Sequence, residues 1–358
     1  MTLLDTYHDT GSDLDSLRPA IQSISDITHI LDTRGRSITF LSLCTLPSQQ
    51  ADGKVVFYNL DKLSIDDFLE GKPFHIVRIQ KDRIPNAFLS ELQSTTGLAM
   101  LIDNKLYLVS DMSIPTLTLR ASVSGKSTIS RQNLIRDMHL ADAIISKNEP
   151  IHLVYRSEMV DGYEIRKVFA AFGSGYRLTP QSLLLDVVDQ LQEDDLICRS
   201  WSIGHDYTKI RLDCSQIPHN LETGSLLPGI TLQTSDIGLS SLTIRSILRD
   251  PETDSYVILQ EHTCKHSAVI CRDDIISTAR DILPKTGSVP SIISGIQSVL
   301  QQCRLPAQHI HTVISDISAG AGSADDYVLV LRSIDRLPVD TQTKDRARRA
   351  IGMSFYSV

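Results

Sequence analysis

Aromatic residues are scarce in this chain of 358 residues: they make up 5% of it, and tryptophan occurs only once. Long hydrophobic runs are missing too, because no stretch approaches the roughly 18 apolar residues that a membrane-spanning helix needs. Residues 1–15 are acidic and lack the apolar segment of a secretory signal. We therefore expect no membrane partner and a location in the cytoplasm.

Positive charge is also in short supply. The chain has 35 Lys and Arg against 43 Asp and Glu, which gives a formal net charge of −8. A protein of this charge does not attract nucleic acid over its whole surface. Any contact with DNA or RNA must therefore use a local basic patch.

Cysteine pairs at the spacing of metal or redox sites are missing. The six cysteines are scattered and include no Cys-x-x-Cys. In a long chain without a secretory leader, such cysteines are typical of buried thiols in a reducing compartment. The Gly-x-Ser-x-Gly turn that exposes a nucleophilic serine is absent as well, so the sequence predicts no catalytic residue.

Strand and helix patterns are both present, and a hydrophobic content of 41% is that of a globular protein. Strands are predicted at 37–44, 55–60, 74–79, 98–102, 105–110, 117–121, 151–155, 163–172, 197–203, 207–212, 242–247, 256–259 and 327–332. Helices are predicted at 14–24, 64–69, 85–94, 133–145, 179–192, 272–283, 289–302 and 341–351. This mixture predicts the α+β class.

The order of these patterns suggests three parts. We expect an N-terminal α+β unit over residues 1–121, a β-rich central domain over 133–271 and a mostly helical C-terminal region over 272–358. Residues 122–132 are small and polar, which is typical of a linker.

The stretch from Gly229 to Cys264 contains the most specific pattern of the chain. A Gly-Ile start precedes a sharp Ser-Asp-Ile-Gly turn, two strand-like runs follow, and a cysteine ends the unit. The residues that carry this pattern are Gly229, Ile230, Ser235, Asp236, Gly238 and Cys264.

This pattern resembles the phage- and plasmid-borne family called domain of unknown function 932. Weaker similarity at 166–191 and 201–214 extends the resemblance to roughly residues 150–275. Lys265 and His266 stand where the family usually has Asn-Gly. The resemblance implies an origin in a mobile element and brings no established activity with it.

Gly125-Lys126-Ser127-Thr128 matches the second half of a phosphate-binding loop. The complete motif needs a glycine five residues before Gly125, and Arg120 stands there. A polar linker is therefore the favoured interpretation of this stretch.

A zinc site is the second chemical hypothesis. His262, Cys264 and His266 alternate along a predicted strand and share one face, with Cys271 five residues further on. Three ligands on one straight strand span about 13 Å, which is too far for a single ion unless the chain bends. The alternative is a buried Cys264 with histidines at the surface, and no other cofactor is predicted.

Basic residues cluster most densely near the C-terminus. The candidates for nucleic-acid contact are Lys344, Arg346, Arg348 and Arg349 on one predicted helix, together with Lys126, Arg131 and Arg136. The C-terminal group is equally compatible with an acidic surface on a neighbouring subunit, or with a helix face that is only solvated.

These observations lead to two hypotheses about function. The first is a non-enzymatic phage or plasmid protein that forms homo-oligomers and contacts DNA or RNA in replication, recombination or maintenance. The alternative is a structural protein of a capsid or virion lattice.

Overall fold

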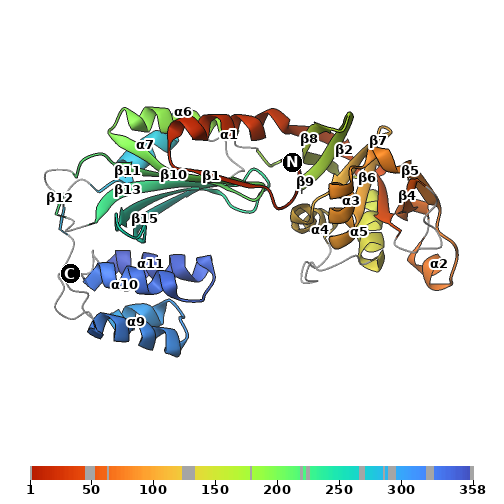
Figure 1. The fold of residues 1–358 in the computed structure, drawn as a ribbon. Helices are drawn as coiled ribbons and strands as arrows, with labels where there is room; N and C mark the ends of the chain where they lie inside the picture. Colours follow the sequence, from red (N-terminus) through yellow and green to blue (C-terminus); the bar gives the residue numbers. More distant parts are fainter. Residues whose placement is uncertain are drawn as a thin grey trace.

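A computed structural model gives the structure of residues 2–44, 53–62, 64–122, 134–177, 180–217, 221–222, 226–265, 271–284, 287–288, 296–319 and 326–354. Two large sheets dominate it, one of eight strands and one of six, and helices cover their faces (Figure 1). The protein is a mixed α+β protein, so the predicted class is confirmed.

The eight-stranded sheet has the order β2-β8-β9-β7-β6-β3-β4-β5, and only β7 and β9 run parallel. Its strands are β2 (Thr28–Arg34), β3 (Thr39–Leu43), β4 (Lys54–Asn59), β5 (Ile76–Gln80), β6 (Leu98–Ile102), β7 (Lys105–Val109), β8 (Pro150–Val160) and β9 (Tyr163–Phe172). One face packs against α4 (Ile114–Ala121) and α5 (Leu134–Lys147) around Phe40 and Met100. The opposite face packs against α3 (Asn86–Ser94) around Phe57 and Phe88.

Turn chemistry defines two hairpins of this sheet. Asp103 and Asn104 both have positive φ angles, 50° and 60°, as the preferred two-residue hairpin loop requires. Asp161 and Gly162 do the same between β8 and β9, with φ angles of 52° and 82°. Both turns lie between strands that the sequence predicts.

The six-stranded sheet is entirely antiparallel, in the order β1-β10-β11-β13-β14-β15. Its strands are β1 (His8–Gly11), β10 (Leu196–Gly204), β11 (Thr208–Cys214), β13 (Leu227–Thr234), β14 (Leu242–Arg249) and β15 (Tyr256–Cys264). Helices α1 (Leu14–Ile27), α6 (Gln181–Gln192) and α7 (Arg272–Ile282) cover one face. Alternate strand residues such as Ile210 and Leu232 form the core with them.

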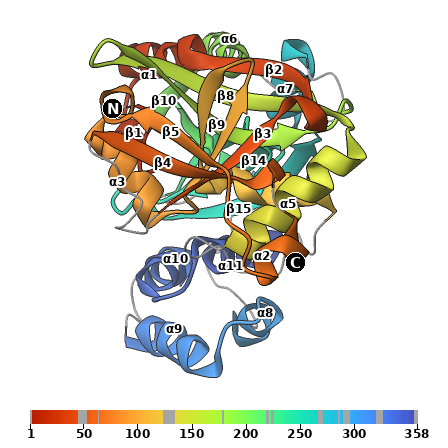
Figure 2. The same cartoon turned by 90° about the vertical axis from the view of Figure 1, so that its right-hand side faces the viewer.

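Four C-terminal helices form a separate group against the other face of this sheet (Figure 2). They are α8 (Ile296–Gln302), α9 (Ala307–Ala319), α10 (Asp326–Arg336) and α11 (Thr341–Ser354). Helix α11 lies directly on β15, and a Cβ atom on Gly352 would come within 1.9 Å of the Ile258 carbonyl oxygen. Glycine is therefore needed at the point where this helix touches the strand. The short helix α2 (Ile65–Leu69) and the two-residue strands β12 (Leu221–Glu222) and β16 (Gly287–Ser288) complete the described elements.

The division into sheets differs from the predicted parts. Strands β8 and β9 belong to the same sheet as β2–β7, so the expected linker at 122–132 falls between two helices of one unit. Conversely, the N-terminal strand β1 belongs to the six-stranded sheet, because it pairs with β10. Helix α1 packs in the core of the same sheet. Hydrophobic periodicity detects elements, but it carries no information on which distant strands pair.

Two predicted strands are helices instead. Residues 117–121 end α4, which begins with Pro115 in its first turn, and residues 327–332 lie inside α10. In α10 the buried positions Val328, Leu331 and Ile334 recur at helical spacing against the neighbouring helices. A run of β-branched and aromatic residues suggested a strand there, and burial of one helical stripe outweighs that propensity.

Candidate functional site

The two sheets meet through a buried ion pair. Arg156 of β8 is fully buried, and its Nη2 donates to both carboxylate oxygens of Asp236, at 3.0 and 2.8 Å. Asp236 belongs to the Ser-Asp-Ile-Gly turn after β13, the most specific motif of the sequence. Through this ion pair, the turn after β13 connects the six-stranded sheet to the eight-stranded one.

His205 lies in the turn between β10 and β11 and contacts the same guanidinium of Arg156. Burial, reinforced by the positive charge of Arg156, lowers the pKa of His205 to about 2. The imidazole ring is therefore neutral at physiological pH, and it packs against the ring of Phe169 with centroids 4.1 Å apart.

A second buried cation ties the N-terminal segment to this junction. Lys167 of β9 donates to the carbonyl of Leu3 at 3.1 Å and pairs with Asp5 at 2.9 Å and with Glu91. The ion pairs of Arg156 and Lys167 are largely buried, and together they hold the two sheets and the N-terminal segment against one another.

A pocket of about 490 Å³, which we call the junction pocket, opens beside this cluster. Its walls come from the end of α4, from the end of β9 and the turn after it, from the turn between β13 and β14, and from the residue after β15. The hydroxyl of Tyr176, in one wall, donates to the carbonyl of Asp236 at 3.2 Å. This pocket therefore adjoins the ion pair between the sheets.

Glycines allow the walls of the pocket to come together. A Cβ atom on Gly173 would lie 2.3 Å from Nη1 of Arg120, so this glycine lets the guanidinium rest on the backbone. Gly238 has a φ of 78°, and a Cβ atom there would lie 2.6 Å from the ring of Phe172. That ring stacks on Tyr176 with the centroids 3.5 Å apart and the planes 7° apart.

Positive charge without acidic partners collects around this pocket. Within the described part of the chain, no ion pair involves Arg120 or Lys265, which line the pocket. Arg177 donates to the carbonyls of Ser174 and Tyr176, and Lys147 donates to the carbonyl of Arg120. Guanidinium and ammonium groups beside glycine backbone and serine hydroxyls are the groups that bind oxyanions such as phosphate.

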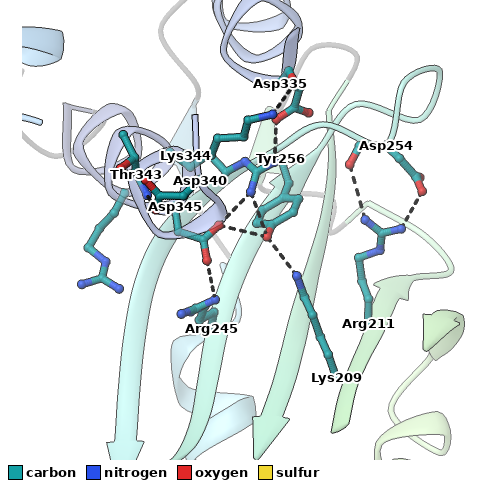
Figure 3. A network of polar contacts seen from close by, with 12 residues as sticks. Lys209, Arg211, Arg245, Asp254, Tyr256, Asp335, Asp340, Thr343, Lys344 and Asp345 are labelled. Carbon is teal, nitrogen blue, oxygen red and sulfur yellow. Dashed lines mark hydrogen bonds and ion pairs between the residues drawn. The ribbon is translucent and has the colours of Figure 1, made fainter. Parts of the chain in front are cut away.

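The predicted C-terminal basic residues lie on α11 and none of them lines this pocket; Figure 3 shows Lys344 among its polar neighbours. Arg348 is buried and pairs with Asp335 and Asp345, and Arg349 pairs with Glu261 of β15. Lys344 donates to the carbonyl of Asp335 at 2.6 Å, and the exposed Arg346 donates to the hydroxyl of Thr343 at 2.9 Å. These side chains meet acidic and polar groups of the same chain, an arrangement that the sequence did not suggest.

Of the remaining basic candidates, only Arg136 belongs to the described part of the chain. Arg136 pairs with its neighbour Asp137, and both are largely buried in the eight-stranded unit. Lys126 and Arg131 lie outside the described residues, as does the Gly-Lys-Ser-Thr motif.

The zinc hypothesis receives no support from the described residues. His262 and Cys264 do share a face of β15, since they pair with Ile244 and Leu242 on β14. Cys264 packs against the core below α7, while Cys271 is exposed, and His266 lies outside the described residues. In the part of the chain that is described, no three His, Cys, Asp or Glu side chains are placed to hold a metal ion.

Sequence reasoning missed the residues of the junction pocket. It treated Arg120 as a mismatch to a phosphate-binding loop and as one of several loosely grouped basic residues, and Lys265 as a departure from a family pattern. The available signals were the two glycine-containing turns, Gly173-Ser174-Gly175 and Ser235–Gly238, because glycine at a fixed turn often marks a close approach of backbone to another group.

Comparison with known proteins gives no further guide. Among the described helices, none has the length and apolar character needed to cross a bilayer. No family model, curated protein or solved structure matches the chain. The resemblance at residues 150–275 stays a hypothesis, and inferences about function depend on the geometry of the site.

Proposed function

We propose that this protein binds nucleic acid by holding phosphate groups in the junction pocket, as a non-enzymatic protein of a phage or plasmid. The observation that carries the proposal is that Arg120 and Lys265 line the pocket without an acidic partner among the described residues. Lys147 and Arg177, which donate to backbone carbonyls of neighbouring residues, likewise have none there. In a chain of net charge −8, such a place is where a polyanion finds the least repulsion.

The chemistry of the pocket favours a backbone contact. The guanidinium of Arg120 can bind two phosphate oxygens at once, and Lys265 adds a point charge from another segment of the pocket lining. The ring pair of Phe172 and Tyr176 offers an apolar surface beside these groups. Because only a few phosphates fit, we expect a shallow salt dependence, with a log–log slope of roughly −1 to −2 for a single strand.

Fluorescence anisotropy with labelled single-stranded and duplex oligonucleotides across a salt series tests this proposal. Arg120→Gln and Lys265→Gln are each expected to weaken binding at least about tenfold, because a charge-assisted hydrogen bond is lost. Arg346→Gln is the matched control, since that arginine is exposed on α11 and far from the pocket in sequence and contacts. Binding that is unaffected by the first two variants, or absent in the wild type at low salt, refutes the proposal.

A lattice protein is the second candidate, favoured by one edge of the molecule. Strand β2 ends the eight-stranded sheet and pairs with β8 on one side, and its Ile30 is 52% exposed. An exposed edge strand is a template for pairing with another copy. Light scattering that finds large assemblies without nucleic acid, abolished by Ile30→Lys, supports this candidate; a monomer at all concentrations removes it.

A further inference from the structure

A second, smaller pocket lies on the six-stranded sheet, on the face opposite to α1, α6 and α7. It has a volume of about 210 Å³ and is lined by Ser200, Trp201 and Ser202 of β10 and by Lys209 and Arg211 of β11. Ser200 pairs with Arg211 and Ser202 with Lys209 across the two strands, so these four side chains share one face. The intervening residues, among them Ile210 and the indole of Trp201, belong to the core on the other face.

The ammonium group of Lys209 is positioned by the neutral hydroxyl of Tyr256. Its Nζ donates to the hydroxyl of Tyr256 at 3.1 Å and lies 5.3 Å from the centroid of that ring (Figure 3). Within the described residues no carboxylate pairs with Lys209, whereas the same hydroxyl also contacts Arg348 and Asp345 of α11. An ammonium that is positioned by a phenol keeps its charge available for an anion.

Arg211 contributes a buried donor without a partner. Its side chain is 10% exposed, and its Nη2 pairs with Asp254 at 2.7 Å. Its Nε has no hydrogen-bond partner among the described residues, and neither does the buried Oγ1 of Thr231, which lies opposite Arg211 on β13. Buried polar groups in proteins are almost always hydrogen-bonded, and Nε of Arg211, a residue that lines the pocket, is a donor that a polar ligand there would satisfy.

The cations around the pocket differ in their partners. Arg249 pairs with both Asp213 and Asp254, and the latter also pairs with Arg211. These two arginines therefore share two carboxylates, whereas Lys209 pairs with no carboxylate among the described residues and its charge is available to a ligand in the pocket.

We propose that this pocket is a binding site for a small oxyanion, a phosphate or a carboxylate group. Its oxygens would accept hydrogen bonds from Nζ of Lys209, from the hydroxyls of Ser200 and Ser202 and from Arg211. The site is separate from the junction pocket, since the two have no lining residue in common.

The single tryptophan makes this site directly observable. Trp201 is the only tryptophan of the chain and lies on β10 between Ser200 and Ser202, with its indole on the other face of the sheet. Its emission therefore reports a change in β10 when an anion binds at this pocket, and calorimetry measures the binding itself. Titration with inorganic phosphate should change the emission with a dissociation constant on the order of 1 mM. Acetate at the same ionic strength distinguishes the two classes: a stronger response to phosphate identifies a phosphate site, and an equal or stronger response to acetate a carboxylate site.

Two variants test the residues that the proposal uses. Lys209→Met should weaken anion binding at least tenfold. Ser202→Asp should abolish binding, because its carboxylate would repel the anion, while the contact of Lys209 with Tyr256 stays in place. Lys105→Met, which removes an exposed lysine from the other sheet, is the matched control and should titrate as the wild type does. The proposal fails if neither anion changes the emission or produces binding heat in calorimetry up to 50 mM, or if folded Lys209→Met and Ser202→Asp proteins bind like the wild type.

Discussion

On helix α11 the basic side chains meet acidic groups of the same chain, whereas around the junction pocket they do not. Arg348 and Arg349 lie in the densest basic run of the sequence, and each has a carboxylate partner in the folded protein. Arg120 and Lys265 are far apart in the sequence and surrounded by uncharged residues, yet they line one pocket without such partners among the described residues. The availability of positive charge therefore depends on what lies opposite each side chain, and local density in the sequence does not report it.

The same comparison separates two uses of an arginine. A paired and buried arginine contributes to stability, since removing it leaves an uncompensated carboxylate. An unpaired arginine at a pocket contributes little to stability and is free to bind. The variants below test this division, beginning with the change that should affect stability most.

Arg156→Met should destabilise the protein by about 3–5 kcal/mol, because it leaves the carboxylate of Asp236 buried and unpaired at the junction of the sheets. Urea unfolding monitored by circular dichroism measures the change. Arg199→Met, at an exposed position of β10, is the matched control and should stay within about 0.5 kcal/mol of the wild type. Replacing both partners, with Arg156→Met and Asp236→Leu together, should recover part of the loss; equal stability of the single variant and the control would show that the pair does not fasten the sheets.

Acid should loosen the same junction through His205. Burial lowers the pKa of this imidazole from 6.5 to about 2, so the folded protein binds fewer protons here than the unfolded chain does. Stability is then fully present above pH 6.5 and is lost as the pH falls below that value, by about 1 kcal/mol per pH unit. The free energy of unfolding between pH 7 and pH 5 should fall less in His205→Asn than in the wild type. His8→Asn, an exposed histidine, should leave the slope unchanged, and a His205 variant with the wild-type slope would contradict the assignment.

Arg348→Met should cost about 2 kcal/mol, because Asp335 and Asp345 lose a partly buried partner between α11 and the sheet. The partially exposed carboxylates retain some access to water, so the loss is smaller than at Arg156. Nucleic-acid affinity should not change. A fall in affinity without a fall in stability would show that α11, and not the junction pocket, meets the phosphates.

Local features of the fold could be predicted from the sequence. Asp103-Asn104 and Asp161-Gly162 are turn pairs whose chemistry alone defines a hairpin, and Ser64 caps α2 as its sequence position indicates. The apolar face of α5 could also be predicted from the sequence, since its buried residues recur at helical spacing. These features depend on residues within a few positions of one another.

The site could not be predicted because it depends on contacts between distant segments. Arg120 reaches the backbone at Gly173 only because α4 packs against β9, and Lys265 joins them only because β15 ends at the junction. The pairing of Arg156 with Asp236 spans 80 positions. No spacing rule links such residues until the order of the strands is known.

Arg120→Gln should change stability least and binding most selectively. The guanidinium rests on Gly173 without a carboxylate partner in the described structure, so its loss should cost less than about 0.5 kcal/mol of unfolding free energy. Oligonucleotide binding should nevertheless weaken about tenfold, whereas Arg346→Gln should alter neither quantity. If Arg120→Gln destabilises the protein as much as Arg348→Met does, then Arg120 is a structural residue with a partner beyond the described residues. The arginines of helix α11 and of the junction pocket would then both serve stability, and the pocket would have no unpaired arginine to bind a phosphate.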